Sequence, residues 1–257
     1  REEGLDALEQ ELSKGLRLVA VSAVQYKTGL RMPIQSMAEL CHRYDAELFV
    51  DAIQAVGATP VDVTWGIDYL SSGSHKHLMG PEGAGFLYVS ERCAEACHPR
   101  LAGWLSHQDA VDFLVGDEAV LRYDKPLNAG AGAFEIGTLN ALGLCALGAS
   151  VDLLREFDLG EVHRHVNGYL DSLEVGLVER GFESFRTAAP EGRSTLLSVR
   201  TPDDAPPTRL AAALSRRGVV CNTPDGLVRF APHWPNHLGE VPDVLASVDA
   251  ALADLRG

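Results

Sequence analysis

The feature that most constrains the fold is a regular alternation of apolar segments with amphipathic helical segments along residues 5–89. Apolar side chains recur at helical spacing in residues 5–16 and 34–44. Continuous apolar runs with the length of buried strands lie at residues 18–22, 46–51, 67–70 and 86–89. Strands that alternate with helices in this way form a mainly parallel sheet with right-handed crossovers. The sequence therefore predicts an α/β fold in which helices flank the sheet.

The pattern changes after residue 90. Residues 99–132 lack a long periodic segment and are predicted to form loops with short helices. Helices are expected again at 139–157 and 161–180. After them come a strand, a helix, two strands and a helix, at residues 194–200, 208–217, 219–222, 227–231 and 241–255. We interpret this mixed arrangement as a smaller α/β domain, so that the predicted division is 1–148 and 149–257.

Composition excludes several classes of partner. The formal net charge is −14, whereas binding to nucleic acid or to an anionic membrane needs clustered Lys and Arg. No apolar run approaches membrane-spanning length, and the first residues resemble no secretory signal. The five cysteines are odd in number and irregularly spaced, which favours reduced thiols and a cytoplasmic location. We expect no metal site, because Cys93 and Cys97 lack a complementary pair of ligands.

Lys76 is one of only four lysines in the chain. It lies in a segment rich in Gly and Ser, between the apolar runs at 67–70 and 86–89. A lysine between two buried strands is partly desolvated, which lowers its pKa and makes the amine available for Schiff-base formation. The alternative is a surface lysine in a turn, and this segment alone does not decide between the two.

Asp51 ends the strand predicted at residues 46–51. In an open parallel sheet, ligands bind at the carboxyl ends of the strands. A carboxylate there can hold a proton on the ring nitrogen of a bound pyridine, as pyridoxal phosphate requires. An aspartate at this place can also cap a helix. A lysine that follows on a turn, one predicted strand later, favours the cofactor interpretation.

The order and spacing of Asp51 and Lys76 resemble the class V aminotransferase family of fold-type I pyridoxal-phosphate enzymes. The family includes cysteine desulfurases, isopenicillin N epimerase-like proteins and kynureninases. Further agreement lies in residues 21–29, 134–140 and 228–233, so the resemblance covers nearly the whole chain. It implies a pyridoxal-phosphate-dependent transferase-like fold: a mainly parallel sheet flanked by helices, in a large cofactor-binding domain, with a smaller C-terminal α/β domain.

The resemblance also implies roles for individual residues. Lys76 would form a Schiff base with the cofactor and then move the proton at the substrate Cα. Asp51 would pair with the pyridine nitrogen, and Gln54 would form a hydrogen bond with the phenolic oxygen of the ring.

A second group of residues would hold the cofactor phosphate. His75 would do so together with Ser74 or Ser72. The serine of the family lies one place earlier than Ser74, where this chain has Gly73, so the choice of serine stays open. Thr138 resembles a residue that reaches the phosphate site of a neighbouring subunit, which implies a homodimer; a helix cap is the alternative.

Arg229 lies within the apolar strand predicted at residues 227–231. A buried arginine needs an anionic partner, and its planar guanidinium binds a carboxylate through two parallel hydrogen bonds. The resemblance implies that Arg229 binds the α-carboxylate of the substrate, which would make the substrate an amino acid. An arginine that faces solvent on an edge strand is the alternative.

The reaction is less narrowly defined than the cofactor. A glutamine at the position of Gln54, three residues after the aspartate, resembles desulfurases and epimerases. The sequences of residues 26–29 and 229–232 resemble kynureninases instead. Cys221 precedes Arg229 by eight residues but lies in an apolar run that is typical of an inert core cysteine. We expect cysteine desulfurase or C–S lyase chemistry or amino transfer, with epimerase-like or kynureninase-like activity as the alternative.

A non-catalytic domain is a second hypothesis. Family members usually carry a substantial segment before the part that matches residues 1–30, and that segment supplies a ring-stacking residue and part of the phosphate site. A domain without it could keep the fold and hold no cofactor. The presence of Lys76, Asp51, Gln54 and Arg229 together favours the enzyme.

Overall fold

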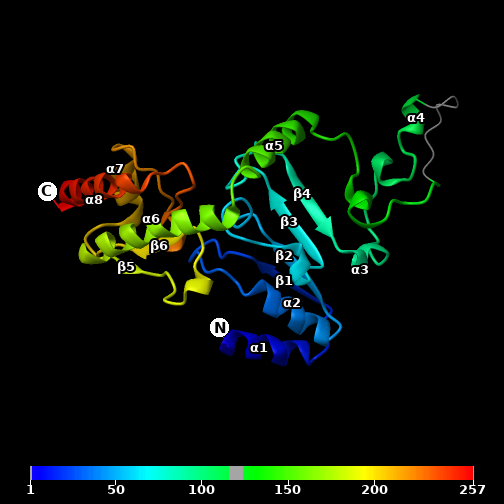
Figure 1. Ribbon diagram of the computed structural model, residues 1–257, viewed down its shortest axis with the longest axis horizontal. Helices are drawn as coiled ribbons and strands as arrows, with labels where there is room; N and C mark the ends of the chain where they lie inside the picture. Colours follow the sequence, from blue (N-terminus) through cyan, green and yellow to red (C-terminus); the bar gives the residue numbers. More distant parts are fainter. Residues whose placement is uncertain (1, 116–123, 257) are drawn as a thin grey trace.

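The computed structural model describes residues 2–115 and 124–256. These residues form a four-stranded and a three-stranded sheet, each packed against helices of its own (Figure 1). Residues 116–123, within the loop region predicted at 99–132, lie outside the described residues. In the described part of the chain, no helix has the length and apolar character needed to cross a membrane.

The first sheet has the order β1-β2-β3-β4, with strands β1 (Leu18–Ser22), β2 (Glu47–Asp51), β3 (Tyr69–Gly73) and β4 (Gly85–Val89). The first three strands are parallel, as predicted. β4 is antiparallel to β3, which the alternating pattern did not indicate. The physical reason is the connection: residues 74–84 contain no helix, and a parallel crossover needs a dozen or more residues.

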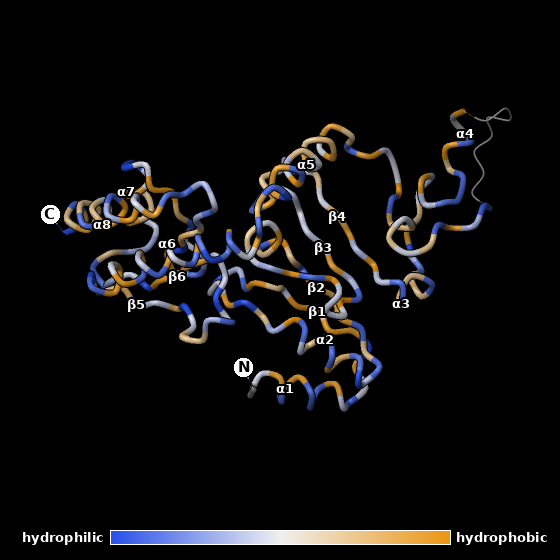
Figure 2. The backbone as a smooth tube through the Cα atoms, in the orientation of Figure 1, coloured by the Kyte–Doolittle hydropathy of each residue, from blue (hydrophilic) through white to orange (hydrophobic). Residues whose placement is uncertain are grey.

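Helices α1 (Glu2–Leu12) and α2 (Ile34–Arg43) lie together on one side of this sheet (Figure 1). Figure 2 shows apolar and polar residues alternating along both helices, while apolar stretches run through the strands. α1 ends four residues before the predicted boundary, because the chain turns at Gly15 with a φ of 90°. The core between helices and sheet contains Leu12, Ala38, Leu48, Val50 and Ile67, all almost completely buried.

The middle of the chain is built from short elements and one long helix. Helices α3 (Glu91–Ala94) and α4 (Asp112–Val115) are single turns; α4 lies within the predicted loop region and α3 just before it. α5 (Ala141–Leu154) packs through Leu147 and Leu154 on Leu78, in the loop between β3 and β4. Short 3₁₀ turns lie at Val63–Trp65, Trp104–Ser106, Gly130–Phe134, Pro190–Gly192, Pro224–Gly226 and Leu238–Glu240.

The second sheet has the order β5-β6-β7 and is entirely antiparallel, with strands β5 (Glu183–Ser184), β6 (Leu197–Arg200) and β7 (Val228–Phe230). Helices α6 (Leu159–Glu179), α7 (Pro207–Ser215) and α8 (Val241–Arg256) share its hydrophobic core.

The strand predicted at 219–222 is wrong: only Asn222 forms a bridge, to Arg229. The turn at Pro224–Gly226 follows directly and leaves no room for a longer pairing. Each sheet has its own main hydrophobic cluster. The predicted boundary at residues 148 and 149 falls within α5 and stays a prediction.

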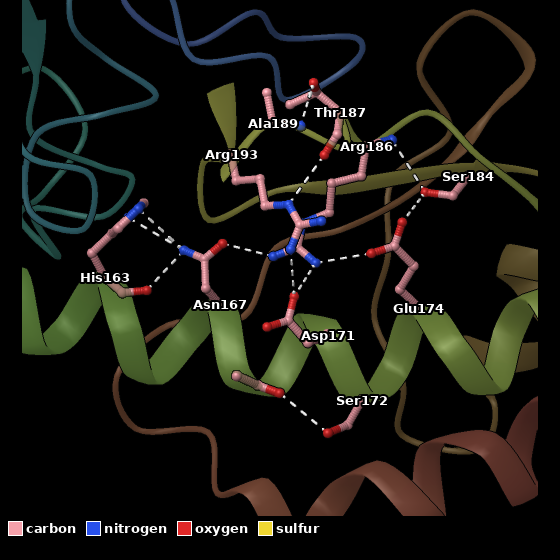
Figure 3. A network of polar contacts seen from close by, with 11 residues as sticks. His163, Asn167, Asp171, Ser172, Glu174, Ser184, Arg186, Thr187, Ala189 and Arg193 are labelled. Atoms are coloured by element: carbon pink, nitrogen blue, oxygen red, sulfur yellow. Dashed lines mark hydrogen bonds and ion pairs between the residues drawn. The ribbon is translucent and has the colours of Figure 1, made fainter. Parts of the chain in front are cut away.

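An ion-pair network around the buried Arg186 fixes the chain segment that leads into β6 (Figure 3). Arg186, whose side chain is 2% exposed, binds Asp171 and Glu174 of α6 at 2.5 and 2.9 Å. Arg186 Nη2 also donates to Asn167 Oδ1 at 2.6 Å, and Arg193 binds Asp171 at 3.2 Å. The side chains of this network attach the 184–193 segment to α6.

The segment after β1 connects the two sheets. Ser194 Oγ donates to the carbonyl oxygen of Gly29, and Ser198 Oγ donates to that of Lys27 at 2.6 Å. Gly29 has a φ of 73°, and a Cβ there would lie 2.8 Å from Leu196 Cβ, so only glycine fits this approach. The residues that follow β1 are therefore held beside β6 and β7.

Candidate active site

The carboxylate of Asp51 lies at the carboxyl end of β2, as predicted. Its Cα is in register with Ser22 of β1 and Ser71 of β3, so the three strand ends form one edge. Asp51 Oδ1 accepts a 3.0 Å hydrogen bond from the Ile53 backbone N–H, which fixes the start of the following turn. The side chain is half-buried and does not cap a helix, because no helix follows β2 directly.

Gln54 lies in the same turn and is 5% exposed. Its Nε2 has no hydrogen-bond partner among the described residues. Nearly all buried polar groups in proteins are paired, and an unpaired amide costs free energy. This amide, three residues after Asp51, is therefore a buried donor without a partner in the described part of the chain, near the carboxyl end of β2.

Lys76 lies in the loop between β3 and β4 and is half-buried. Burial lowers the pKa of its amine, the positive charge of Arg229 lowers it further, and Asp51 acts in the opposite direction. Lys76 Nζ also lies 5.8 Å from the centre of the Tyr26 ring. Lys76 is therefore not the solvated turn lysine that was the alternative interpretation.

Arg229 lies in the centre of β7 and is 6% exposed, so it does not face solvent. Its Nη1 donates to the backbone carbonyl of Tyr26 at 2.7 Å, and Nε has no partner in the described part of the chain. The guanidinium carbon lies 4.2 Å from the centre of the Tyr26 ring. Burial lowers the pKa of Arg229. The contacts to Tyr26 are neutral, which leaves the positive charge available for an anion.

The residues predicted to hold a phosphate differ in their accessibility. His75 is exposed, and a Cβ at Gly73 would lie 3.3 Å from its ring. Ser72 Oγ donates to the carbonyl of Gly73 at 2.9 Å. Ser74 is completely buried, and its hydroxyl donates to the carbonyl of Pro81 within the same loop. Of this group, His75 is the side chain open to a ligand.

Thr138 is exposed and precedes α5 by three residues. It does not cap the helix, because the N-cap is Asn140, whose Oδ1 accepts from the Gly143 N–H at 3.0 Å. Asn140 Nδ2 also donates to the carbonyl of Gly83 at 3.1 Å. The segment with Thr138 is thereby attached to the loop that carries Lys76.

Three residues at this site were not assigned from the sequence: Tyr26, His77 and His233. His233 Nε2 lies 2.8 Å from the carbonyl oxygen of His77, and the two rings are edge-on with centres 5.1 Å apart. Burial lowers the pKa of His77 to about 4, and His233, Lys76 and Arg229 contribute. Tyr26 and His233 fall within stretches that resemble the family, but the sequence carries no signal for their contacts.

Cys221 is half-buried against the core of the second sheet. Burial raises the pKa of its thiol to about 11. The thiol is therefore protonated at neutral pH, whereas the thiolate is the nucleophilic form. The structure agrees with the interpretation of Cys221 as a core cysteine.

The chain is similar to several known proteins. An uncharacterized aminotransferase of Bacillus subtilis is 28% identical over 249 residues, which cover 96% of this chain and 62% of that protein. A kynureninase of Deinococcus radiodurans is 29% identical over 262 residues, which cover 98% of this chain and 61% of that protein. The chain thus spans less than two thirds of the length of these relatives.

A solved structure and a family model provide the remaining comparisons. The apo cysteine desulfurase of Thermococcus onnurineus NA1 has a TM-score of 0.83 and 24% identity, over 96% of this chain and 62% of that one. This likeness confirms the predicted fold. Residues 1–227 match the family model described as aminotransferase class-V. The chain therefore belongs to the class V aminotransferase family, as its motifs predicted.

Proposed function

We propose that this chain forms part of a pyridoxal-phosphate-dependent enzyme that acts on an amino acid through Lys76. The observation that carries the proposal is the electrostatic environment of the Lys76 amine, which both Asp51 and Arg229 influence. A partly buried amine with a lowered pKa is unprotonated more often than that of a surface lysine, and the unprotonated form is the nucleophile. The family membership supports the same assignment.

The residues of the site fit this cofactor. The unpaired Nε2 of Gln54 can donate to the phenolic oxygen of the cofactor ring, which would satisfy a buried donor that has no partner among the described residues. The half-buried carboxylate of Asp51, at the same strand end, can pair with the ring nitrogen. Donor and carboxylate would thus hold two different atoms of one ring.

We assign the phosphate to His75 first, because its ring is exposed at the loop. Ser72 and Ser74 remain candidates, and each would have to exchange its present carbonyl partner for the phosphate. Thr138 would act from a neighbouring subunit. Ile136, Leu139 and Leu142, close to it in the sequence, are apolar and 45%, 47% and 86% exposed, which supports a homodimer.

In the reaction, Lys76 would hold the cofactor through Nζ and then move the proton at Cα of the substrate. Arg229 would bind the α-carboxylate and so orient the bond that breaks. The cofactor, when bound, supplies an electron sink for the negative charge that develops at Cα. The neutral His77 adds no positive charge beside Lys76, which keeps the amine available as a base.

We place C–S bond cleavage without a cysteine nucleophile, or amino transfer, ahead of sulfur transfer to a protein thiol. The reason is the raised pKa of Cys221, which keeps this thiol protonated. Epimerase-like and kynureninase-like reactions, which also need no thiol, remain the second choice. We further propose a cytoplasmic location, since thiols stay reduced there.

The test is an absorbance titration of the purified protein with pyridoxal phosphate. Wild-type protein is expected to develop a band near the visible edge, Lys125→Ala to keep it, and Lys76→Ala to lose it. Borohydride reduction followed by peptide mass spectrometry should place the cofactor on Lys76. A band that survives Lys76→Ala, or its absence from wild-type protein, would contradict the proposal.

A further inference from the structure

The carbonyl group of His77, the residue after Lys76, is held from two sides. On one side is Gly57, which has a φ of 97°, and a Cβ there would lie 2.5 Å from the His77 oxygen. On the other side His233 Nε2 lies 2.8 Å from the same oxygen. The peptide group between His77 and Leu78, one residue beyond Lys76, therefore has little freedom to rotate.

The chemistry of the contact defines the proton on His233. A carbonyl oxygen only accepts hydrogen bonds, so Nε2 must carry the hydrogen. Nδ1 is buried and has no partner in the described part of the chain. Burial lowers the pKa of His233, which agrees with a neutral ring that is unprotonated at Nδ1.

The segment around His233 is itself anchored. Trp234 packs with Leu78 in a small hydrophobic cluster and lies 4.9 Å from Phe157, ring centre to ring centre. His233 follows the central arginine of β7, Arg229, by four residues. Contacts at His233 thus join the segment that carries Arg229 to the loop that carries Lys76.

The two residues that contact the His77 carbonyl, Gly57 and His233, lie in the chain segments of Asp51 and Arg229. Gly57 follows Asp51 by six residues and Gln54 by three. His233 belongs to the segment of Arg229. The segments that carry Asp51 and Arg229 thus both contact the backbone near Lys76. These are the two residues whose charges act on the Lys76 amine.

We infer that His233 is a positioning residue for Lys76, acting through its Nε2–H···O=C bond to His77. The bond fixes the peptide between His77 and Leu78 and with it the loop backbone next to Lys76, so the amine keeps its half-buried position instead of turning into solvent. The role in catalysis rests on the proposed function. The placement of the amine does not, because it depends only on contacts within the chain.

The test measures the Lys76 amine without cofactor. Acetylation by acetic anhydride is followed over a series of pH values, with the rate at each lysine obtained by peptide mass spectrometry. Lys14, whose side chain is 64% exposed, serves as the internal reference. His233→Gln keeps an N–H donor close to the Nε2 position, and His233→Phe keeps the ring but removes the donor.

In wild type the acetylation midpoint of Lys76 is expected below that of Lys14. In His233→Phe it should rise toward the free-lysine value of about 10.4, while His233→Gln should stay near wild type. Equal midpoints in all three proteins would overturn the inference. An equal shift in both variants would also overturn it, since ring packing and not the hydrogen bond would then be responsible.

A measurement on the unsubstituted protein covers the case in which His233→Phe does not fold. Nitrogen-15 NMR of the imidazole reports which ring nitrogen carries the proton. The Nε2–H form supports the inference, and the Nδ1–H form excludes the hydrogen bond. Because neither experiment uses pyridoxal phosphate, failure of the absorbance test would leave both results valid, and the reverse also holds.

Discussion

Arg229 and Tyr26 are 203 residues apart in the sequence, yet they form a double contact. Arg229 Nη1 donates to the Tyr26 carbonyl at 2.7 Å, and the guanidinium carbon lies 4.2 Å from the centre of the Tyr26 ring. The hydrogen bond and the ring together restrict the plane of the guanidinium. Because a carboxylate binds best along that plane, this contact would orient Arg229 for a substrate.

Replacing Arg229 should remove recognition of the α-carboxylate. Arg229→Gln is expected to weaken amino-acid binding by about thirtyfold or more, since loss of one partner of a buried charge pair costs about 2–5 kcal/mol. Arg229→Lys should recover only part of this loss, because lysine lacks the planar fork. Spectral titration of the cofactor-loaded protein with amino acids gives the dissociation constants.

The control for this prediction is Arg216→Gln, at an exposed position just after α7. It should bind amino acids as wild type does. A decarboxylated amine should bind equally to wild type and Arg229→Gln. If Arg229→Gln weakened the amine and the amino acid to the same extent, Arg229 would not be the carboxylate-binding residue.

Tyr26 should affect substrate affinity through Arg229. In Tyr26→Leu the ring is lost, and the KM for the amino acid is expected to rise, consistent with a cation–π contribution of about 0.5–2 kcal/mol. Tyr26→Phe keeps the ring and the backbone carbonyl, so its KM should stay near wild type. A large effect of Tyr26→Phe would instead assign the role to the hydroxyl.

The sequence predicted the parts of this site that depend on local pattern. Asp51 ends a strand because an apolar run stops there, and Lys76 follows the next run, so both positions could be read from the chain. The antiparallel direction of β4 could not, because an apolar run has no direction and the loop length decides it. The contacts of Tyr26 with Arg229 and of His233 with His77 also could not be predicted, since they depend on how the two sheets meet. For Ser74 the residue type suggested a ligand, whereas the backbone turns its hydroxyl toward Pro81.

Cys221 should be dispensable for the reaction. Burial raises the pKa of its thiol to about 11, so its reaction with iodoacetamide at pH 8 is expected to be far slower than that of the exposed Cys145. Cys221→Ala should keep the turnover of the wild type with the same amino acid. Loss of turnover in this variant, with folding unchanged by circular dichroism, would restore a role for the thiol.

Asp68 should stabilise the fold in a pH-dependent way. Its side chain is 2% exposed and receives hydrogen bonds from Arg92 at 2.8 and 2.9 Å, from the Leu48 N–H at 2.8 Å and from His42 at 3.0 Å. Burial alone would raise its pKa, but these bonds outweigh burial and lower the pKa from 3.8 to about 2. Asp68→Asn should therefore cost about 2 kcal/mol at pH 7, measured by urea unfolding.

The sign of the pH effect follows from the lowered pKa. The carboxylate favours the folded state above the unfolded pKa of 3.8, and this contribution disappears as the pH falls toward about 2. The difference between wild type and Asp68→Asn should shrink over that interval. Asp203→Asn, at an exposed position, should have the same unfolding free energy as wild type throughout this pH range. A difference for Asp68→Asn that does not change with pH would mean that shape, not charge, is responsible.

Gln54 offers a test in which stability and cofactor binding should move in opposite directions. Without cofactor, its buried Nε2 has no partner among the described residues, and an unsatisfied donor of this kind costs about 1–3 kcal/mol. Gln54→Met has a similar length and no donor, so the cofactor-free protein should melt at the same or a higher temperature. The same substitution should weaken pyridoxal-phosphate binding, because the phenolic oxygen would lose its donor.

Thermal melts with and without cofactor measure both effects on one sample, and Gln35→Met, at an exposed position of α2, is the matched control. If Gln54→Met lowered the melting temperature of the cofactor-free protein and left cofactor affinity unchanged, the amide would serve the fold and not the cofactor.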